Sequence, residues 1–166
     1  DAAALCPSDR NLTDDQLQAV AASGGMVGIN FFPGFLDPAY FQGHGASLDR
    51  LFADLERLEM AYADDPARKM AEVHRSAAAT RAKQGPARAD IDLVVDHIAH
   101  IVALVGDDHV GFGSDFDGVL DLPHDIPDCR AYPKILSRLA ERGFGERSVA
   151  KIAGENFLRV LRASDR

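Results

Sequence analysis

Two aspartates that directly follow a short apolar run are the side chains in this sequence best suited to chemistry. Asp115 and Asp117 lie in the segment Gly111-Phe112-Gly113-Ser114-Asp115-Phe116-Asp117-Gly118. Enzymes built on parallel sheets keep catalytic groups at the carboxyl ends of their strands, and carboxylates there can transfer a proton or bind a metal ion. Asp and Gly are also frequent turn residues, so the pattern alone fits a simple turn equally well. The regular acidic spacing and closing Glu of an EF-hand are lacking.

Arg10 is a second candidate, because it stands just before a predicted helix start at Asn11-Leu12-Thr13. In a loop between a strand and a helix, its guanidinium could bind a carboxylate through two parallel hydrogen bonds. Taken alone, a loop arginine is more often a solvated surface charge. The aromatic run Phe31-Phe32-Pro33-Gly34-Phe35 could floor a substrate pocket, and packing beneath neighbouring helices explains it as well.

The histidines do not form a complete metal site in the sequence. His97 and His100 are three residues apart on a predicted helix, a spacing that can present two imidazoles to one ion, but no third ligand is near. We expect them to be a structural pair at the surface or boundary of the fold. His109 opens a strand at the end opposite the aspartates, so a structural role is expected there too. The other histidines are expected to be exposed: His44, His74 and His124.

These candidates depend on an alternation of strands and helices. Thr13-Asp14-Asp15-Gln16 is a capping box that predicts a helix to about Ala22, and the apolar run 26–32 predicts a strand buried on both faces, as in a parallel sheet. The most regular apolar periodicity predicts a helix from Ile91 to Val105, ended by Gly106. The other expected elements are helices over 47–63 and 66–83, a Gly85-Pro86 break, a strand over 109–115, a loop over 118–128, a helix near 131–142 and two short helices on either side of Gly154.

Composition limits the classes of partner. Of the 166 residues, 46% are hydrophobic, which is enough for one domain with one core, and the net charge of −8 opposes binding to nucleic acid or anionic lipid surfaces. No apolar stretch is long enough to span a bilayer. Cys6 and Cys129 can form at most one disulfide, which fits a reducing compartment. We therefore expect a cytoplasmic protein, with an exported form as the alternative.

The order of strand, helix, strand, helix is typical of an α/β protein, but two strands are too few to close such a fold. We therefore interpret residues 1–166 as a single domain that forms the last quarter to half of a larger α/β fold. The sequence also lacks the motifs of several enzyme classes: the G-x-S-x-G elbow, the P-loop, H-E-x-x-H and G-x-G-x-x-G.

Six segments in order give the sequence a family resemblance. Together they resemble the C-terminal part of the membrane (renal) dipeptidases, peptidase family M19, and the resemblance covers essentially the whole chain. The segments are Arg10-Asn11-Leu12-Thr13-Asp14-Asp15, Gly25-Met26-Val27-Gly28-Ile29-Asn30-Phe31, Asp96-His97-Ile98 with His100-Ile101, Gly111 to Gly118, Tyr132-Pro133, and Gly154-Glu155-Asn156-Phe157-Leu158-Arg159-Val160.

The resemblance implies the C-terminal portion of a (β/α)8 TIM barrel, with residues 26–32 as strand seven, 109–115 as strand eight and 37–85 as a helical excursion between them. It also implies zinc-dependent hydrolysis of dipeptides, with two zinc ions bridged by a glutamate. Arg10 matches the family's arginine that binds the free carboxylate of the substrate. Asp115 matches the strand-eight aspartate that handles protons around the scissile peptide bond.

The same resemblance places the zinc ligands upstream of Asp1, so no metal ligand is expected within this chain, and the isolated chain is expected to be inactive. Asn30, Phe35 and Asp117 are further expected substrate-binding residues. The expected partners are a dipeptide substrate and, in a homodimer, a second copy of the protein. Two other functions remain open. One is a non-catalytic or ligand-binding barrel relative, and the other is an amidohydrolase-type metal hydrolase such as a deacetylase or lactonase, against which Arg10 argues modestly.

Overall fold

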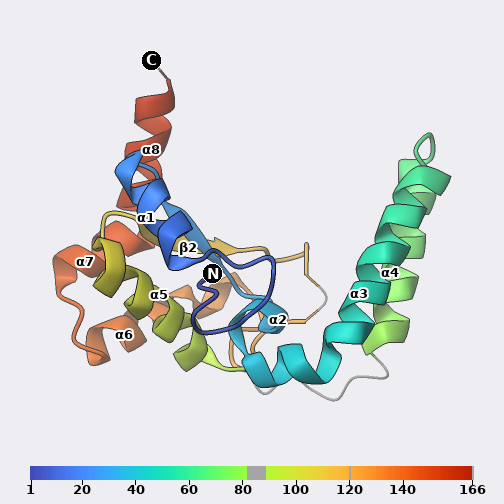
Figure 1. Cartoon of the computed structure of the whole chain (residues 1–166), viewed down its shortest axis with the longest axis horizontal. Coiled ribbons are helices and arrows are strands. Elements are labelled where there is room, and N and C mark those ends of the chain that lie inside the picture. Colours follow the sequence, from blue (N-terminus) through green and yellow to red (C-terminus); the bar gives the residue numbers. More distant parts are fainter. Residues whose placement is uncertain (82–88, 120, 166) are drawn as a thin grey trace.

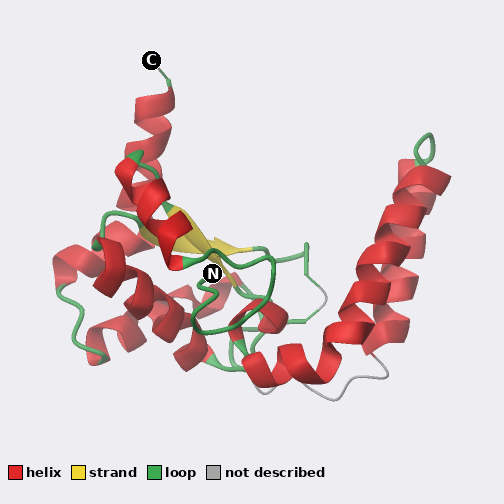
Figure 2. Ribbon diagram, in the orientation of Figure 1, coloured by secondary structure: helices red, strands yellow, loops and turns green. Residues whose placement is uncertain are grey.

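A computed structural model describes residues 1–81, 89–119 and 121–165, without the side chains of residues 45–49, 51, 52, 77, 80 and 81. Two short parallel strands lie among helices, and a pair of long helices stands away from this body (Figures 1 and 2). The chain is therefore a helix-rich α/β structure with a small parallel sheet, as the alternation of elements predicts.

The sheet pairs β1 (Val27–Asn30) with β2 (Val110–Ser114). Ile29 lies opposite Phe112, and a register shift then brings Asn30 opposite Ser114. Both strands are shorter than the ranges predicted from the sequence. The prediction that the first strand is buried on both faces is wrong for this chain, because Ile29 is buried while Gly28 is exposed. Helices cover the face of the sheet on which Ile29 lies. Within the described residues, the opposite face, on which Gly28 lies, is less completely covered.

Local sequence signals account for two helices that pack against each other, of which α5 also packs on the strands. Helix α1 (Asp14–Ala22) starts at the predicted capping box, in which Thr13 accepts from the Gln16 amide and the Gln16 side chain accepts from the Thr13 amide. Helix α5 (Ile91–Val105) is capped by Asp90 and ends at Gly106, whose φ of 89° suits glycine. Both predicted helices are confirmed.

The predicted pair of helices after β1 is confirmed, with different bounds. After the single turn α2 (Pro33–Leu36), helix α3 (Pro38–Ala61) begins well before residue 47, because Asp37 caps it by accepting from the Ala39 amide. Helix α4 (Pro66–Arg81) starts at the proline that breaks the pattern. The predicted end of this helix at 83 and the Gly85-Pro86 break lie outside the described residues.

The C-terminal third follows the prediction closely. A loop leads from β2 to η1 (Cys129–Ala131), α6 (Tyr132–Glu141) and α7 (Glu146–Ala150). A π-helical turn, η2 (Lys151–Glu155), then contains Gly154 and connects to α8 (Asn156–Ser164). Within the described residues, no helix is both long and apolar enough to cross a membrane.

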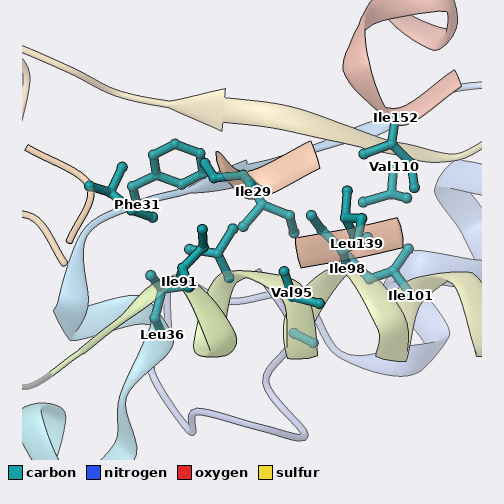
Figure 3. Close-up of a cluster of buried hydrophobic side chains, with 14 of the residues drawn as sticks. Ile29, Phe31, Leu36, Ile91, Val95, Ile98, Ile101, Val110, Leu139 and Ile152 are labelled. Carbon is teal, nitrogen blue, oxygen red and sulfur yellow. The ribbon is translucent and has the colours of Figure 1, made fainter. Parts of the chain in front are cut away.

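One hydrophobic core lies between the sheet, α5 and α6. Ile29 and Val110 from the strands meet Ile98 and Ile101 of α5 and Leu139 of α6, and all five side chains have no exposed surface (Figure 3). The periodic apolar face of α5 is thus the face that packs on the strands. This packing fixes the strands, and with them the residues at their carboxyl ends.

Candidate active site

Asn30 and Asp115 meet where the two strands end. The Asn30 amide Nδ2 donates to Asp115 Oδ2 at 3.0 Å, and Asn30 Oδ1 accepts from the Phe32 amide at 2.8 Å. Because both ends of the Asn30 side chain are engaged, its amide is held in one orientation. The Asp115 side chain is exposed at this strand edge. The structure thus presents an oriented carboxylate at the position where sheet enzymes keep their chemistry.

The backbone around Asp115 forms a tight left-handed turn. The φ values of Ser114, Asp115 and Asp117 are 44°, 68° and 68°. Residues other than glycine seldom occupy this region of backbone conformation. The Asp115 amide donates to the Gly113 carbonyl at 2.6 Å, and the Gly118 amide donates to the Asp115 carbonyl at 3.1 Å. A Cβ on residue 118 would collide with Asp115 Oδ1. The segment is therefore a turn, as its composition suggests, but the Asp115 carboxylate bonds across to β1.

Arg10 and Phe35 form a second pair. The Arg10 guanidinium carbon lies 5.6 Å from the centre of the Phe35 ring, a cation–π arrangement. The neighbouring Asn11 side chain is buried and donates to the carbonyls of Phe35 at 2.8 Å and Cys6 at 2.9 Å. Within the described residues, no hydrogen bond or ion pair of Asp115 reaches this pair. The predicted site residues therefore form two separate groups, Asn30 with Asp115 and Arg10 with Phe35. Asp117 is exposed and lies next to the first group in the sequence.

The loop that carries Arg10 is anchored by contacts that sequence reasoning did not predict. Asp1 Oδ1 accepts from the Asn30 amide at 3.0 Å, and the Ala2 amide donates to His97 Nδ1 at 3.0 Å. His97 Nε2 in turn donates to the Leu36 carbonyl at 3.2 Å. These contacts join the loop to β1, α2 and α5. Only the presence of a histidine on an apolar helix hinted at them in the sequence.

His97 is fully buried, so the prediction that it lies at the surface or boundary is wrong. Burial lowers the pKa of His97 to about 4, which keeps the ring neutral and matches its one donated and one accepted bond. His100 is half-buried and pairs with Asp14 of α1 at 2.8 Å. The two histidines therefore have separate structural partners. His109 has a structural contact as well, because Nδ1 donates to the Gly25 carbonyl at 2.8 Å.

The described residues do not form a metal site by themselves. Among them, no three His, Cys, Asp or Glu side chains lie close enough to share an ion. One buried acceptor near the strand ends lacks a hydrogen-bond partner within the described chain, the Oδ2 atom of Asp1. A single carboxylate oxygen is not a ligand set, since protein sites for zinc use three or four ligands. Both cysteines are free thiols, and burial raises the pKa of Cys6 to about 11.

Comparison with known proteins assigns the chain to a family. The sequence matches the family model of the membrane dipeptidases, peptidase family M19, over residues 1–166. The chain belongs to family M19. This M19 chain is 31% identical over 157 residues to an uncharacterized dipeptidase of Schizosaccharomyces pombe, a match that covers 94% of the chain and 27% of the relative. It is 32% identical over 159 residues to a Klebsiella pneumoniae protein described as uncharacterized, with 96% and 42% covered.

Solved structures of M19 enzymes share the fold. A metallopeptidase from Rhodobacter sphaeroides, liganded with a phosphinate mimic of the dipeptide L-Ala-D-Ala, is 29% identical with a TM-score of 0.64. The match covers 97% of the M19 chain and 33% of that structure. A second M19 structure, the dipeptidase AC, is 28% identical with a TM-score of 0.61, over 94% and 33% of the two chains. The M19 chain thus spans less than half the length of these relatives.

Proposed function

We propose that the full-length protein is a zinc-dependent dipeptidase in which residues 1–166 supply the substrate-carboxylate clamp and the proton-handling aspartate. The observation that carries this proposal is the exposed Asp115 carboxylate, oriented by Asn30 at the carboxyl ends of β1 and β2 in a chain of family M19. The proposal includes a (β/α)8 barrel completed by other parts of the protein, with β1 and β2 as strands seven and eight.

Hydrolysis of a peptide bond needs a group that moves a proton from the attacking water to the leaving amine. Asp115 is suited to both steps, since a carboxylate can accept the proton as water adds to the carbonyl and return it as the C–N bond breaks. Asn30 occupies one lone pair of Oδ2, so we assign the transferred proton to Oδ1. The proton that water loses is then the one that the leaving amine gains.

Arg10 is the proposed binding group for the free carboxylate of the dipeptide. Its guanidinium can donate two parallel hydrogen bonds to a carboxylate, and the Phe35 ring beneath it limits its orientation. A fixed C-terminal carboxylate sets the distance to the scissile bond, which favours substrates of two residues. Asp117 and Asn30 remain proposed substrate contacts beside Asp115. The zinc ions would polarise the scissile carbonyl when bound, and they would need ligands in addition to the described residues, among which no complete ligand set is found.

The test compares a dipeptide with its C-terminal amide. The metal-loaded full-length protein is assayed with L-Ala-D-Ala, the dipeptide mimicked in the Rhodobacter sphaeroides structure, and with L-Ala-D-Ala amide. We expect hydrolysis of the free acid and a strong preference for it. Arg10→Gln should raise KM for the acid by about 10- to 100-fold while activity on the amide changes little. Arg162→Gln, at an exposed position on α8, is the charge-matched control.

Other outcomes separate the alternatives. Equal turnover of acid and amide in the wild type would contradict the carboxylate clamp and favour a different amidohydrolase-type substrate. A full-length protein that binds no metal and cleaves no dipeptide would favour a non-catalytic or ligand-binding barrel. An unchanged KM in Arg10→Gln would show that Arg10 does not bind the substrate carboxylate, and it would leave the proposal of dipeptidase activity standing.

A further inference from the structure

Arg10 lines one wall of a cleft whose opposite wall is helix α3. The cleft has a volume of about 510 Å³ and is lined by Arg10 together with Leu55, Glu56, Glu59 and Met60. Helix α3 runs outward from the body as part of the α3–α4 pair (Figure 1). About one and a half turns of α3 therefore face Arg10, which is the residue proposed to bind the substrate carboxylate.

This wall of α3 is apolar and acidic. Leu55 is half-buried, and Met60 is 75% exposed, which is unusual for a large apolar side chain. Glu59 pairs with Lys69 of α4 at 2.8 Å, so part of its charge is compensated. Glu56 is exposed and has no ion-pair partner within the described residues. The cleft thus sets one cation on the body against an uncompensated carboxylate on the helix.

The side chain of a substrate's C-terminal residue must lie close to this wall. The side chain and the free carboxylate of that residue are attached to the same carbon atom, so a carboxylate on Arg10 brings the side chain into the same cleft. An apolar side chain can contact Leu55 and Met60, whereas an acidic side chain meets the charge of Glu56. Two like charges that face each other across a cleft at a protein surface repel enough to change binding several-fold.

We propose that this face of α3 selects the C-terminal residue of the substrate, accepting apolar and basic side chains and disfavouring acidic ones. The proposal rests on the proposed function, because it requires Arg10 to bind the substrate carboxylate. Glu56 supplies the discrimination by charge, and Leu55 and Met60 supply the apolar surface.

The test uses two substrates of nearly equal shape and different charge. The metal-loaded full-length protein is assayed with Ala-Gln and Ala-Glu, and kcat/KM for Ala-Glu is divided by that for Ala-Gln. The wild-type ratio should be well below one. Glu56→Gln should raise the ratio about three- to tenfold, and Glu56→Lys should raise it further. The matched control is Glu72→Gln, which removes the same charge from α4, where Glu72 lines the separate cleft between α3 and α4.

Each result tests either the inference about α3 or the proposed dipeptidase function on which that inference rests. A wild-type ratio near one, or a ratio that Glu56→Gln leaves unchanged while Ala-Gln is still cleaved, overturns the specificity wall and leaves the dipeptidase proposal standing. An equal rise in the Glu72→Gln control shows a general charge effect and also overturns it. Failure to cleave either dipeptide rejects the proposed function and the inference together.

Discussion

The body of the chain and the α3–α4 pair are stabilised by different kinds of interaction. In the body, α5 alone buries Val94, Val95 and Ile98 completely, and the loop, strand and helix ends exchange hydrogen bonds. In the α3–α4 pair, Tyr40 near the base is the one described residue that is buried, and the ion pairs are exposed. The body holds atoms in fixed positions, whereas the pair presents side chains to a cleft. Proton transfer needs the first arrangement, and selection among substrates can use the second.

The largest effect among these tests of the two regions is expected for a substitution of Asp115, which belongs to the body. Asp115→Asn keeps the size and a hydrogen-bonding group but is a much weaker base, so on the proposed function kcat of the full-length protein should fall about 10²- to 10⁴-fold. Metal content and thermal midpoint should change little, because the side chain is exposed. Asp54→Asn on α3 is the control and should keep near wild-type kcat. Wild-type turnover in Asp115→Asn would remove it from the chemistry.

Stability should also separate the two regions. Ile98→Ala removes a fully buried side chain from the core and should cost about 2–5 kcal/mol of unfolding free energy. Leu58→Ala, at the half-buried interface of α3 and α4, should cost about 1 kcal/mol or less. Urea denaturation of the full-length protein measures both. Equal losses would mean that the pair is packed as tightly as the body.

The pH dependence of stability should depend on the body's buried histidine. His97 has a folded pKa of about 4, below its unfolded value near 6.5, so the unfolded state binds more protons between these pH values. Its contribution is fully present above pH 6.5 and is lost as pH falls, by about 3 kcal/mol at pH 4. His97→Gln should flatten this part of the profile of urea midpoints, and His74→Gln, at an exposed position on α4, should not. A profile unchanged by His97→Gln would contradict a buried neutral ring.

The smallest effect is expected for an ion pair on the outer helices. Arg75 contacts Glu72 at 2.6 Å, but the Arg75 side chain is 71% exposed. Arg75→Ala should therefore change the unfolding free energy by about 0.5 kcal/mol or less, and the change should shrink in high salt. Denaturant midpoints at low and high salt provide the measurement. A loss above 1 kcal/mol would show that surface charge holds this pair of helices together.

The parts predicted correctly from the sequence are those with local causes. The Thr13 capping box and the periodic face from Ile91 to Val105 depend on residues within a few turns of each other, so their helices could be located in advance. The early start of α3 was missed although Asp37-Pro38 is itself a local signal. Asp115 was placed correctly at the carboxyl end of β2, whereas its role in chemistry stays a prediction.

What the sequence could not provide are contacts between distant segments. The bond from the Ala2 amide to His97 spans 95 positions, and that from Asn30 to Asp115 spans 85. Such pairs are set by how the strands and α5 pack, which no local pattern encodes. For the same reason Asn30 was predicted only as a substrate contact, and its role in orienting Asp115 emerged from the fold. The substrate contacts of Asn30, Phe35 and Asp117 stay predictions.

The left-handed turn at residues 114–117 has a consequence for how this protein tolerates change. A residue with a Cβ held at positive φ costs about 1 kcal/mol relative to glycine, and Asp115 and Asp117 both sit there. Asp117→Gly should thus make the fold more resistant to heat, whereas Asp115→Gly would also remove the hydrogen bond from Asn30 and, on the proposed function, turnover. Laboratory evolution for thermostability alone would therefore favour glycine at position 117 more than at position 115. At Asp115 the same backbone cost is set against the hydrogen bond from Asn30 and the proposed proton transfer, so a carboxylate at this position would exchange stability for chemistry.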